Sequence, residues 1–188
     1  CARLAAEQGY RVCINYRSDD AAAASIVRAI EDAGGEAVAL RADVANEAEV
    51  ESLFAQVDAR FGRLDAFVNN AGVLAQQMRV DQMDGARIER IMMTNVVGSF
   101  LCAREAVRRM STRHGGSGGA IVNISSRAAV LGSPGEYVDY AASKAALDAL
   151  TIGLSKEVAG AGIRVNGVRP GLIHTTMHAE GGEPGRVE

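Results

Sequence analysis

The sequence predicts a doubly wound α/β fold, in which helices cover both faces of a parallel sheet. Short apolar segments of strand length alternate with longer segments whose apolar residues recur at helical spacing. Parallel neighbouring strands need helical crossovers rather than tight turns, so this alternation favours a parallel sheet. Because no internal repeat or domain boundary is visible, we expect residues 1–188 to form a single domain.

The clearest helix is expected at residues 47–61. Charged residues fill one face, and Gly62 follows as a stop signal. Apolar residues fill the other face at helical spacing, namely Val50, Leu53, Phe54, Val57 and Phe61. The other helices are expected near residues 1–8, 23–30, 85–113 and 137–158, and the strands at residues 11–16, 36–40, 64–69, 119–125 and 163–168.

Composition excludes several classes of function. Twenty basic and 23 acidic residues give a formal net charge of −3, without the concentrated positive charge that nucleic-acid binding requires. No apolar run reaches the roughly 18 residues of a membrane-spanning helix, so we expect no membrane partner. Three scattered cysteines (Cys1, Cys13 and Cys102) are too few for a disulfide framework or a metal site, which favours a reducing compartment such as the cytoplasm.

The two ends of the sequence are those expected of a fragment. Residues 1–8 are helix-forming, yet no capping residue or initiator methionine precedes them. No further element closes the chain after the glycine-rich residues 181–185. We therefore expect a domain that is truncated at both ends.

Chemistry in such a sheet is expected at the carboxyl ends of the strands, where the loops leave a crevice. Tyr140 and Lys144 lie about one helical turn apart, so their side chains share one face of the predicted helix. A nearby cation favours the phenolate and lowers its pKa from about 10, which would let Tyr140 exchange a proton with an alcohol or a carbonyl. An ordinary helix, with a half-buried tyrosine and a solvated lysine, is the alternative for this spacing alone.

Two further polar residues would complete such a site. Ser126 follows a strand, and its hydroxyl can hydrogen-bond the same substrate oxygen, with Ser125 as its rival. Asn95 lies on the helical stripe expected to face the sheet, where a buried amide needs hydrogen-bond partners. A hydrogen-bonded core asparagine is the alternative. The stripe consists of Ile88, Met92, Asn95, Val96 and Ser99.

Five motifs occur in an order that is typical of one family. They are Asn69-Asn-Ala-Gly72 after a strand, Asn95-Val-Val-Gly98 within a helix, Ser125-Ser126 after a strand, Tyr140-Ala-Ala-Ser-Lys144, and Pro170-Gly171. Together they resemble the short-chain dehydrogenase/reductase family, from the first residues to about Met177. The resemblance implies a Rossmann-like sheet with the strand order 3-2-1-4-5-6-7.

The same resemblance implies an oxidoreductase that interconverts a secondary alcohol and a ketone by hydride transfer. Tyr140 would donate or accept the proton at the substrate oxygen, and Ser126 would hold that oxygen. Lys144 would lower the pKa of Tyr140 and contact the nicotinamide ribose, and Asn95 would anchor a water in the proton relay. The hydride belongs to the cofactor. A nucleotide-binding regulatory module without turnover is the alternative.

The resemblance also implies positions that bind the cofactor. These are the adenine-bracketing pair Asp43 and Val44, the residues Asn69, Ala71 and Gly72 along the adenosine ribose, the carboxamide loop with Pro170, Gly171, Ile173 and Thr175, and the catalytic Tyr140 and Lys144.

The end of the strand at residues 11–16 predicts which nicotinamide cofactor is used. An acidic residue there would bond the free ribose hydroxyls, whereas Arg17 and Ser18 can pair with a 2′-phosphate. We therefore predict NADP(H), with NAD(H) as the alternative because Asp19 and Asp20 lie close by.

The family's phosphate-binding glycine motif and its first strand would precede Cys1. The resemblance therefore implies a gap in the sheet and low activity for residues 1–188 alone, and we predict function for the full-length protein. Glycines at 115–119 cannot replace the motif, because they follow a helix and lead into a strand. By resemblance we expect a small-molecule alcohol or carbonyl substrate and a homo-oligomer, either a dimer or a tetramer, formed through the helices at 85–113 and 137–158.

Other polar residues receive weaker interpretations. His174 and His178 have a spacing that can bind metal, but no third ligand is near, so we expect no metal site. Arginines near the end of the helix at 85–113 suit its dipole and are expected to be solvated. Arg127 lies next to Ser126 and is a candidate for attracting an anionic substrate.

Overall fold

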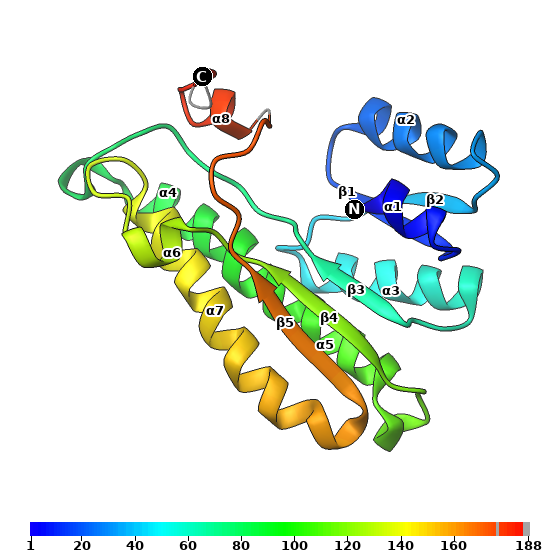
Figure 1. Cartoon of the computed structure of the whole chain (residues 1–188). Coiled ribbons are helices and arrows are strands. Elements are labelled where there is room, and N and C mark those ends of the chain that lie inside the picture. Colours follow the sequence, from blue (N-terminus) through cyan, green and yellow to red (C-terminus); the bar gives the residue numbers. More distant parts are fainter. Residues whose placement is uncertain (176, 186–188) are drawn as a thin grey trace. The chain divides into compact units, whose positions relative to one another are not determined.

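The computed structural model describes residues 1–175 and 177–185, which form two compact units (Figure 1). The first unit spans Cys1–Leu64, and the second begins at Asp65. Each unit has its own sheet, and every strand pair in both sheets is parallel. The predicted α/β class with parallel sheets is therefore confirmed.

In the first unit, a two-stranded sheet is combined with three helices. Strand β1 (Val12–Tyr16) pairs with β2 (Ala37–Arg41), and the register places Val12 opposite Ala37 and Tyr16 opposite Arg41. The helices are α1 (Ala2–Glu7), α2 (Asp20–Glu31) and α3 (Glu47–Phe61). Tyr16 and Arg41 thus end their strands together, so the residues that follow both strands leave the sheet at the same edge.

Helix α3 agrees with its prediction residue by residue. The side-chain oxygen of Asn46 accepts hydrogen bonds from the backbone N–H groups of Ala48 and Glu49 at 3.0 and 3.3 Å, which caps the first turn. Gly62 ends the helix with a φ of 73°, a conformation that favours glycine. The predicted apolar stripe is buried in full: Val50, Leu53, Phe54, Val57 and Phe61.

In the second unit, three strands form a parallel sheet in the order β3-β4-β5. Two long helices, α5 and α7, run along this sheet and pack against it and against each other (Figure 1). The strands are β3 (Ala66–Asn69), β4 (Gly119–Ile124) and β5 (Ile163–Val168). The helices are α4 (Gly85–Met92), α5 (Gly98–Met110), α6 (Ala128–Leu131), α7 (Val138–Val158) and α8 (Met177–Glu180), with short turns η1 (Val80–Gln82), η3 (Thr112–His114) and η4 (Ala159–Ala161).

The helix predicted over residues 85–113 is interrupted. A π-helical turn, η2 (Met93–Val97), separates α4 from α5. Buried positions here recur every four residues, at Arg87, Ile91, Asn95, Ser99 and Ala103. An α-helix completes a turn in about 3.6 residues, so a spacing of four drifts around its axis. The wider π turn offsets this drift.

The predicted sheet-facing stripe is consequently wrong at its start. Ile88 is 39% exposed, whereas Ile91 is fully buried. Asn95 and Ser99 are buried as expected, while Met92 and Val96 are only partly buried. The sequence pattern assumes a regular α-helix, and the π turn changes which residues reach the core.

Candidate active site

The four predicted catalytic residues all belong to the second unit. Tyr140 and Lys144 lie near the start of α7, and Ser126 directly follows β4. Asn95 lies within η2. Helix α7 packs against both β4 and η2. The start of α7, the end of β4 and the π turn therefore meet at the carboxyl end of this sheet.

Lys144 is a buried ammonium group at this meeting point. The residue is 3% exposed, and its Nζ donates a hydrogen bond to the carbonyl oxygen of Ile124 at 2.8 Å. Nζ lies 5.6 Å from the centre of the Tyr140 ring, within cation–π range. Burial disfavours the charged form and lowers the pKa of Lys144 to about 8. Lys144 is therefore charged at neutral pH but titrates much closer to it than a solvated lysine.

Tyr140 does not show the predicted pKa shift. Burial raises the pKa of the phenol above its ordinary value, and a hydrogen bond with the Ser126 side chain opposes this rise without cancelling it. The prediction that Lys144 depresses this pKa is therefore wrong for the structure. The physical reason is that the phenol is desolvated together with the lysine. The phenol stays protonated at neutral pH.

The structure assigns different contacts to the two neighbouring serines. Ser125 is buried, and its hydroxyl donates to the carbonyl oxygen of Lys144 at 3.0 Å. Ser126 is half-buried and hydrogen-bonds Tyr140, and its Oγ accepts from the N–H of Ala128 at 3.1 Å. Ser126 is thus the hydroxyl beside the phenol, while Ser125 fastens α7 to the end of β4.

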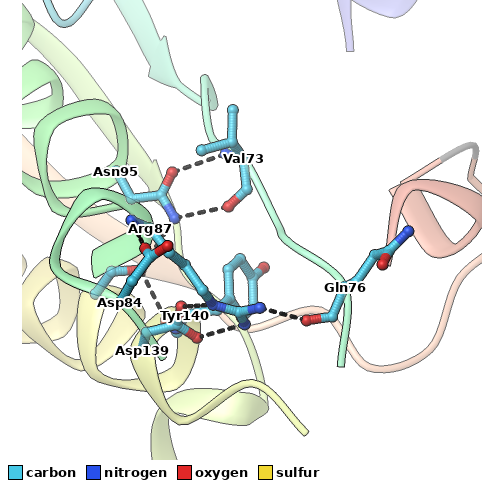
Figure 2. Close-up of polar contacts among 8 residues, drawn as sticks. Val73, Gln76, Asp84, Arg87, Asn95, Asp139 and Tyr140 are labelled. Carbon is cyan, nitrogen blue, oxygen red and sulfur yellow. Dashed lines mark hydrogen bonds and ion pairs between the residues drawn. The ribbon is translucent and has the colours of Figure 1, made fainter. Parts of the chain in front are cut away.

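The side chain of Asn95 connects three segments. Its Oδ1 accepts from the N–H of Val73 at 2.7 Å, and its Nδ2 donates to the carbonyl oxygen of Val73 and to the hydroxyl of Ser143, both at 3.0 Å (Figure 2). Its own backbone carbonyl accepts from the Ser99 hydroxyl at 2.7 Å. The amide is satisfied, as the core-asparagine alternative requires. Its role in a proton relay stays a prediction.

Gly72 brings the motif after β3 to the same place. A Cβ atom at Gly72 would lie 3.3 Å from Lys144 Nζ, which is tighter than ordinary packing, and 3.4 Å from Asn95 Oδ1, which is at the limit of ordinary contact. Glycine therefore leaves the space beside the ammonium open. Ala71 is half-buried. Asn69 is buried, and its Nδ2 donates to the carbonyl oxygen of Ser99 at 3.0 Å.

A buried amide network holds this sheet to its helices and is absent from the sequence predictions. Asn123, fully buried in β4, accepts from Asn69 Nδ2 at 3.1 Å and donates to the hydroxyl of Thr151 at 2.9 Å. Thr151 in turn donates to the carbonyl oxygen of Leu147 at 2.8 Å. The signal in the sequence is an asparagine inside an otherwise apolar strand, which must find partners when buried.

A second missed feature is a buried ion pair beside Tyr140. Arg87 on α4 and Asp139 on α7 have side chains that are 8% and 3% exposed, and Arg87 Nε lies 2.8 Å from Asp139 Oδ2 (Figure 2). Nothing in the local sequence predicts this pair, because its members are 52 positions apart.

The loop after β5 lies next to the loop that carries Ser126. The N–H of Ser125 donates to the carbonyl oxygen of Val168 at 2.8 Å, and the N–H of Arg127 donates to the carbonyl oxygen of Pro170 at 3.0 Å. These two bonds continue the pairing of β4 with β5 beyond the strands. Pro170 is half-buried. The other predicted carboxamide contacts, Gly171, Ile173 and Thr175, are exposed.

The residues predicted to contact the 2′-phosphate and the adenine belong to the first unit, whereas those predicted along the adenosine ribose belong to the second. Arg17 and Ser18 follow β1 and are exposed, and the carbonyl oxygen of Arg17 accepts from Arg41 Nε at 3.0 Å. Asp43 follows β2, and its Oδ1 accepts from the N–H of Ala45 at 2.9 Å. Val44 is buried. These four residues therefore flank the carboxyl ends of the two strands.

The acidic neighbours of Arg17 are engaged within the same unit. Asp19 caps α2, its side chain accepting from the N–H of Ala22 at 2.9 Å. A hydrogen bond to Asp20 is the main cause that raises the pKa of Tyr16. Both carboxylates thus have partners on their own unit.

Within the described part of the chain, the remaining candidates have no contact that assigns them a role in this site. The side chain of His178 lies outside the described residues, while His174 is exposed. Among the described side chains, no group of three or more His, Cys, Asp or Glu residues could hold a metal ion. Arg127 is exposed, and its interaction with an anionic substrate stays a prediction. Within residues 1–175 and 177–185, no helix is long and apolar enough to cross a membrane.

The arginines near the end of α5 are not simply solvated. Arg104, Arg108 and Arg109 converge on Glu105, which is 4% exposed, with N–O distances of 3.1, 2.7 and 2.7 Å. Burial alone would raise the pKa of Glu105, but these guanidinium groups lower it overall. The expectation of a solvated side chain is therefore wrong for Arg109, which is 19% exposed, whereas Arg108 is 56% exposed and both solvated and paired.

The geometry defines a parallel α/β protein with a Tyr–Ser–Lys cluster at the end of its sheet. A family model described as short chain dehydrogenase matches residues 1–184. The chain belongs to the short-chain dehydrogenase/reductase family, whose enzymes act on CH–OH and carbonyl groups with NAD(H) or NADP(H).

Two relatives and one solved structure illustrate this membership. The chain is 56% identical to "Uncharacterized oxidoreductase YgfF" of Escherichia coli over 187 residues, covering 100% of this chain and 76% of that protein. It is 39% identical to "3beta-hydroxysteroid dehydrogenase 1" of Eggerthella lenta over 179 residues, covering 95% and 67%. A crystal structure of a short chain dehydrogenase from Burkholderia cenocepacia in complex with NADP matches with a TM-score of 0.85 and 33% identity, covering 94% of this chain and 69% of that one.

Proposed function

We propose that the full-length protein is an NADP(H)-dependent oxidoreductase that interconverts a secondary alcohol and a ketone. The observation that carries the proposal is the cluster of Tyr140, Ser126 and Lys144 at the end of β4, with Ser126 hydrogen-bonded to the phenol and the ammonium 5.6 Å from its ring. We also propose that both units belong to one Rossmann-like domain, because the family model runs through both of them.

In this proposal Tyr140 is the proton donor for ketone reduction. Burial raises the pKa of the phenol, which keeps its proton in place at neutral pH until a substrate oxygen arrives. Ser126, already hydrogen-bonded to the phenol, is positioned to hold that oxygen. The pKa of Lys144, about 8, is close enough to neutral for a proton to be exchanged there.

The residues around Lys144 fit a nicotinamide nucleotide. The cofactor supplies the hydride when it is bound. An ammonium has three N–H donors, and the Ile124 carbonyl takes one of them, so Lys144 has the capacity to hold a ribose hydroxyl. Gly72 leaves the adjacent space open. Pro170, Gly171, Ile173 and Thr175 would hold the carboxamide.

The first unit supports a preference for NADP(H) over NAD(H). Arg17 and Ser18 are exposed at the end of β1, where a guanidinium can make charge-assisted hydrogen bonds to a phosphate. Asp19 and Asp20, the residues that left NAD(H) open, are engaged by Ala22 and Tyr16. Asp43 and Val44 would bracket the adenine.

We also propose that the protein is a homo-oligomer, a dimer or a tetramer, formed through the α4–α5 run and α7. Met93, Val97 and Phe100 are exposed along the α4–α5 run, and Ile152 is exposed on α7. Light scattering of the full-length protein should give a multiple of the monomer mass, and Phe100→Asp should reduce it. The cysteines are all free, which suits a reducing compartment such as the cytoplasm.

The function is tested by NADPH oxidation with a panel of ketones. The panel includes a 3-ketosteroid, because one relative is named as a hydroxysteroid dehydrogenase, and an acetoacetyl thioester as a small ketone. We expect turnover with at least one ketone and its loss, by about 10³-fold or more, in Tyr140→Phe, while NADPH binding stays close to that of the wild type. Tyr10→Phe, at an exposed tyrosine of the first unit, is the control.

Two outcomes contradict the proposal. Unchanged turnover in Tyr140→Phe rejects the assigned proton donor. NADPH binding without turnover on any ketone or alcohol favours the nucleotide-binding regulatory module instead.

A further inference from the structure

We propose that the buried Arg87–Asp139 pair is a positioning device that fixes Tyr140 and the segment 73–78 relative to each other. The inference rests on the proposed function, because it assigns the pair a role toward the proposed proton donor. Its members come from α4 and α7 and lie in the second unit with Tyr140.

The pair has the geometry of a fork against a carboxylate. Arg87 Nε donates to Asp139 Oδ2 at 2.8 Å, and Nη2 donates to Oδ1 at 3.3 Å. Two roughly parallel bonds fix the orientation of the guanidinium plane as well as its distance. The backbone N–H of Arg87 donates to Asp84 Oδ1 at 2.7 Å, so the start of α4 is fixed as well.

Asp139 extends this geometry to Tyr140. Its Oδ1 also accepts from the backbone N–H of Tyr140 at 2.9 Å. This N–H belongs to the first turn of α7, where no intrahelical carbonyl is available, and the preceding Tyr137 provides no side-chain cap. A carboxylate is also favoured at a helix N-terminus by the dipole. The carboxylate that holds Arg87 therefore anchors the backbone that carries the phenol.

Arg87 extends the geometry in the other direction. Its remaining terminal nitrogen, Nη1, donates to the backbone carbonyl of Gln76 (Figure 2). The same segment is held at Val73 by Asn95 and at Met78, whose N–H donates to the carbonyl oxygen of Glu136 at 2.9 Å. Segment 73–78 directly follows Gly72, the residue beside Lys144. Segment 73–78 is thus hydrogen-bonded to η2, to α4 and to Glu136, which lies just before α7.

A stability role alone explains this arrangement poorly. A buried ion pair loses most of its Coulomb energy to desolvation, and apolar residues of similar volume often stabilise a fold as well or better. An apolar pair, however, cannot hold a carbonyl oxygen and a backbone N–H in fixed directions. The ion pair therefore fixes the orientation of the backbone groups that it bonds. Proton transfer requires such fixed positions, since small misplacements of a reacting group lower the rate by large factors.

Two variants of the full-length protein separate positioning from stability. Arg87→Lys keeps the charge next to Asp139 but cannot bond the carboxylate and Gln76 as a planar fork. Arg87→Met combined with Asp139→Leu removes both charges and keeps the side-chain bulk. The control is Glu105→Gln, which breaks another buried ion-pair cluster in the second unit, on α5.

For each variant, kcat and KM are measured with NADPH and whichever of the 3-ketosteroid and the acetoacetyl thioester is reduced faster. Backbone hydrogen exchange of residues 73–78 provides a readout that needs no substrate. We expect kcat per folded molecule to fall at least tenfold in both variants, with KM for NADPH within twofold of the wild type, and exchange in 73–78 to accelerate at least tenfold. Glu105→Gln should lower the melting temperature with kcat unchanged.

The positioning role of the Arg87–Asp139 pair is rejected, and the proposed function is not, if two results are found together. Tyr140→Phe is inactive, and both variants keep kcat per folded molecule and hydrogen exchange in residues 73–78 within twofold of the wild type. If the double variant does not fold, Arg87→Lys decides by the same criteria. A fully active Tyr140→Phe would instead reject the proposed function, and the exchange data would still show whether the pair holds the segment.

Discussion

The two units place polar residues near the carboxyl ends of their sheets in different environments. In the first unit, Arg17 and Ser18 are exposed beyond β1. In the second, Lys144 is 3% exposed and Asn95 is fully buried. An exposed cation can attract a phosphate without being held in a fixed position, because the attraction acts over several ångströms. A proton, in contrast, moves only between groups held at fixed distances. Substitutions in the first unit should therefore change cofactor affinity, and those in the second should change rate and stability.

After Tyr140→Phe, the largest effect is expected for Lys144→Met in the full-length protein. The substitution removes the only ammonium that the structure places beside the Tyr140 ring in the described residues, together with the proposed contact to the ribose. We expect kcat/KM for NADPH-dependent reduction to fall by about 10³-fold. Steady-state kinetics measure the loss, and a fall of less than tenfold would place the chemistry elsewhere.

Substitution of Ser126 should mainly lower the rate, whereas substitution of Ser125 should mainly lower the stability. Ser126→Ala removes the hydroxyl that hydrogen-bonds Tyr140, and we expect kcat to fall by about 10²-fold with little change in stability. Ser125→Ala removes the bond to the Lys144 carbonyl and should cost about 1 kcal/mol of unfolding free energy. Kinetics and urea denaturation of both variants test the assignment, which is reversed if Ser125→Ala is the slower enzyme.

Stability should depend on pH through Lys144. Its pKa is about 8 in the folded chain and 10.5 for an ordinary solvated lysine, as in the unfolded chain, so the unfolded chain binds more protons between these values. The penalty for burying the charge is therefore full below pH 8 and fades as the pH rises toward 10.5. Relative to Lys144→Met, the wild type should gain about 2 kcal/mol of unfolding free energy between pH 7 and about 9.5. Urea denaturation at both pH values measures this gain, and a flat difference would mean that Lys144 titrates normally.

The smallest effect is expected in the first unit. Arg17→Glu replaces an exposed cation by an anion, which should raise KM for NADPH about tenfold and leave KM for NADH within twofold. The effect should shrink at high salt, because exposed charges are screened. Equal changes for both cofactors would show that Arg17 does not interact with the 2′-phosphate.

Local patterns in the sequence predict much of this molecule. The apolar stripe of α3 is recovered completely, because spacing in one regular helix determines which residues are buried. The order of the motifs also places Tyr140, Ser126 and Lys144 near one strand end, since parallel strands present their carboxyl ends at one edge. These features depend on short-range regularity and on topology.

Features that depend on tertiary contacts are not predictable in this way. The Arg87–Asp139 pair joins distant positions, and its burial arises only when α4 packs near α7. The pKa of Tyr140 depends on how much water is excluded, so the spacing of Tyr140 and Lys144 alone gives the wrong direction. The exposure of Ile88 follows from a π turn that regular periodicity does not contain.

The π turn at Met93–Val97 adds to the length of the α4–α5 run without changing which side of α4 and α5 faces the core. Such a turn is equivalent to one residue inserted into an α-helix. Shortening it by one residue would restore an uninterrupted helix, with Ile91 before it and Cys102 after it still directed inward. We expect the fold to survive this deletion, whereas the side chain of Asn95 would lose its two hydrogen bonds with Val73. Removal of one residue from this turn would therefore separate its contribution to the fold from its contribution to the proposed active site.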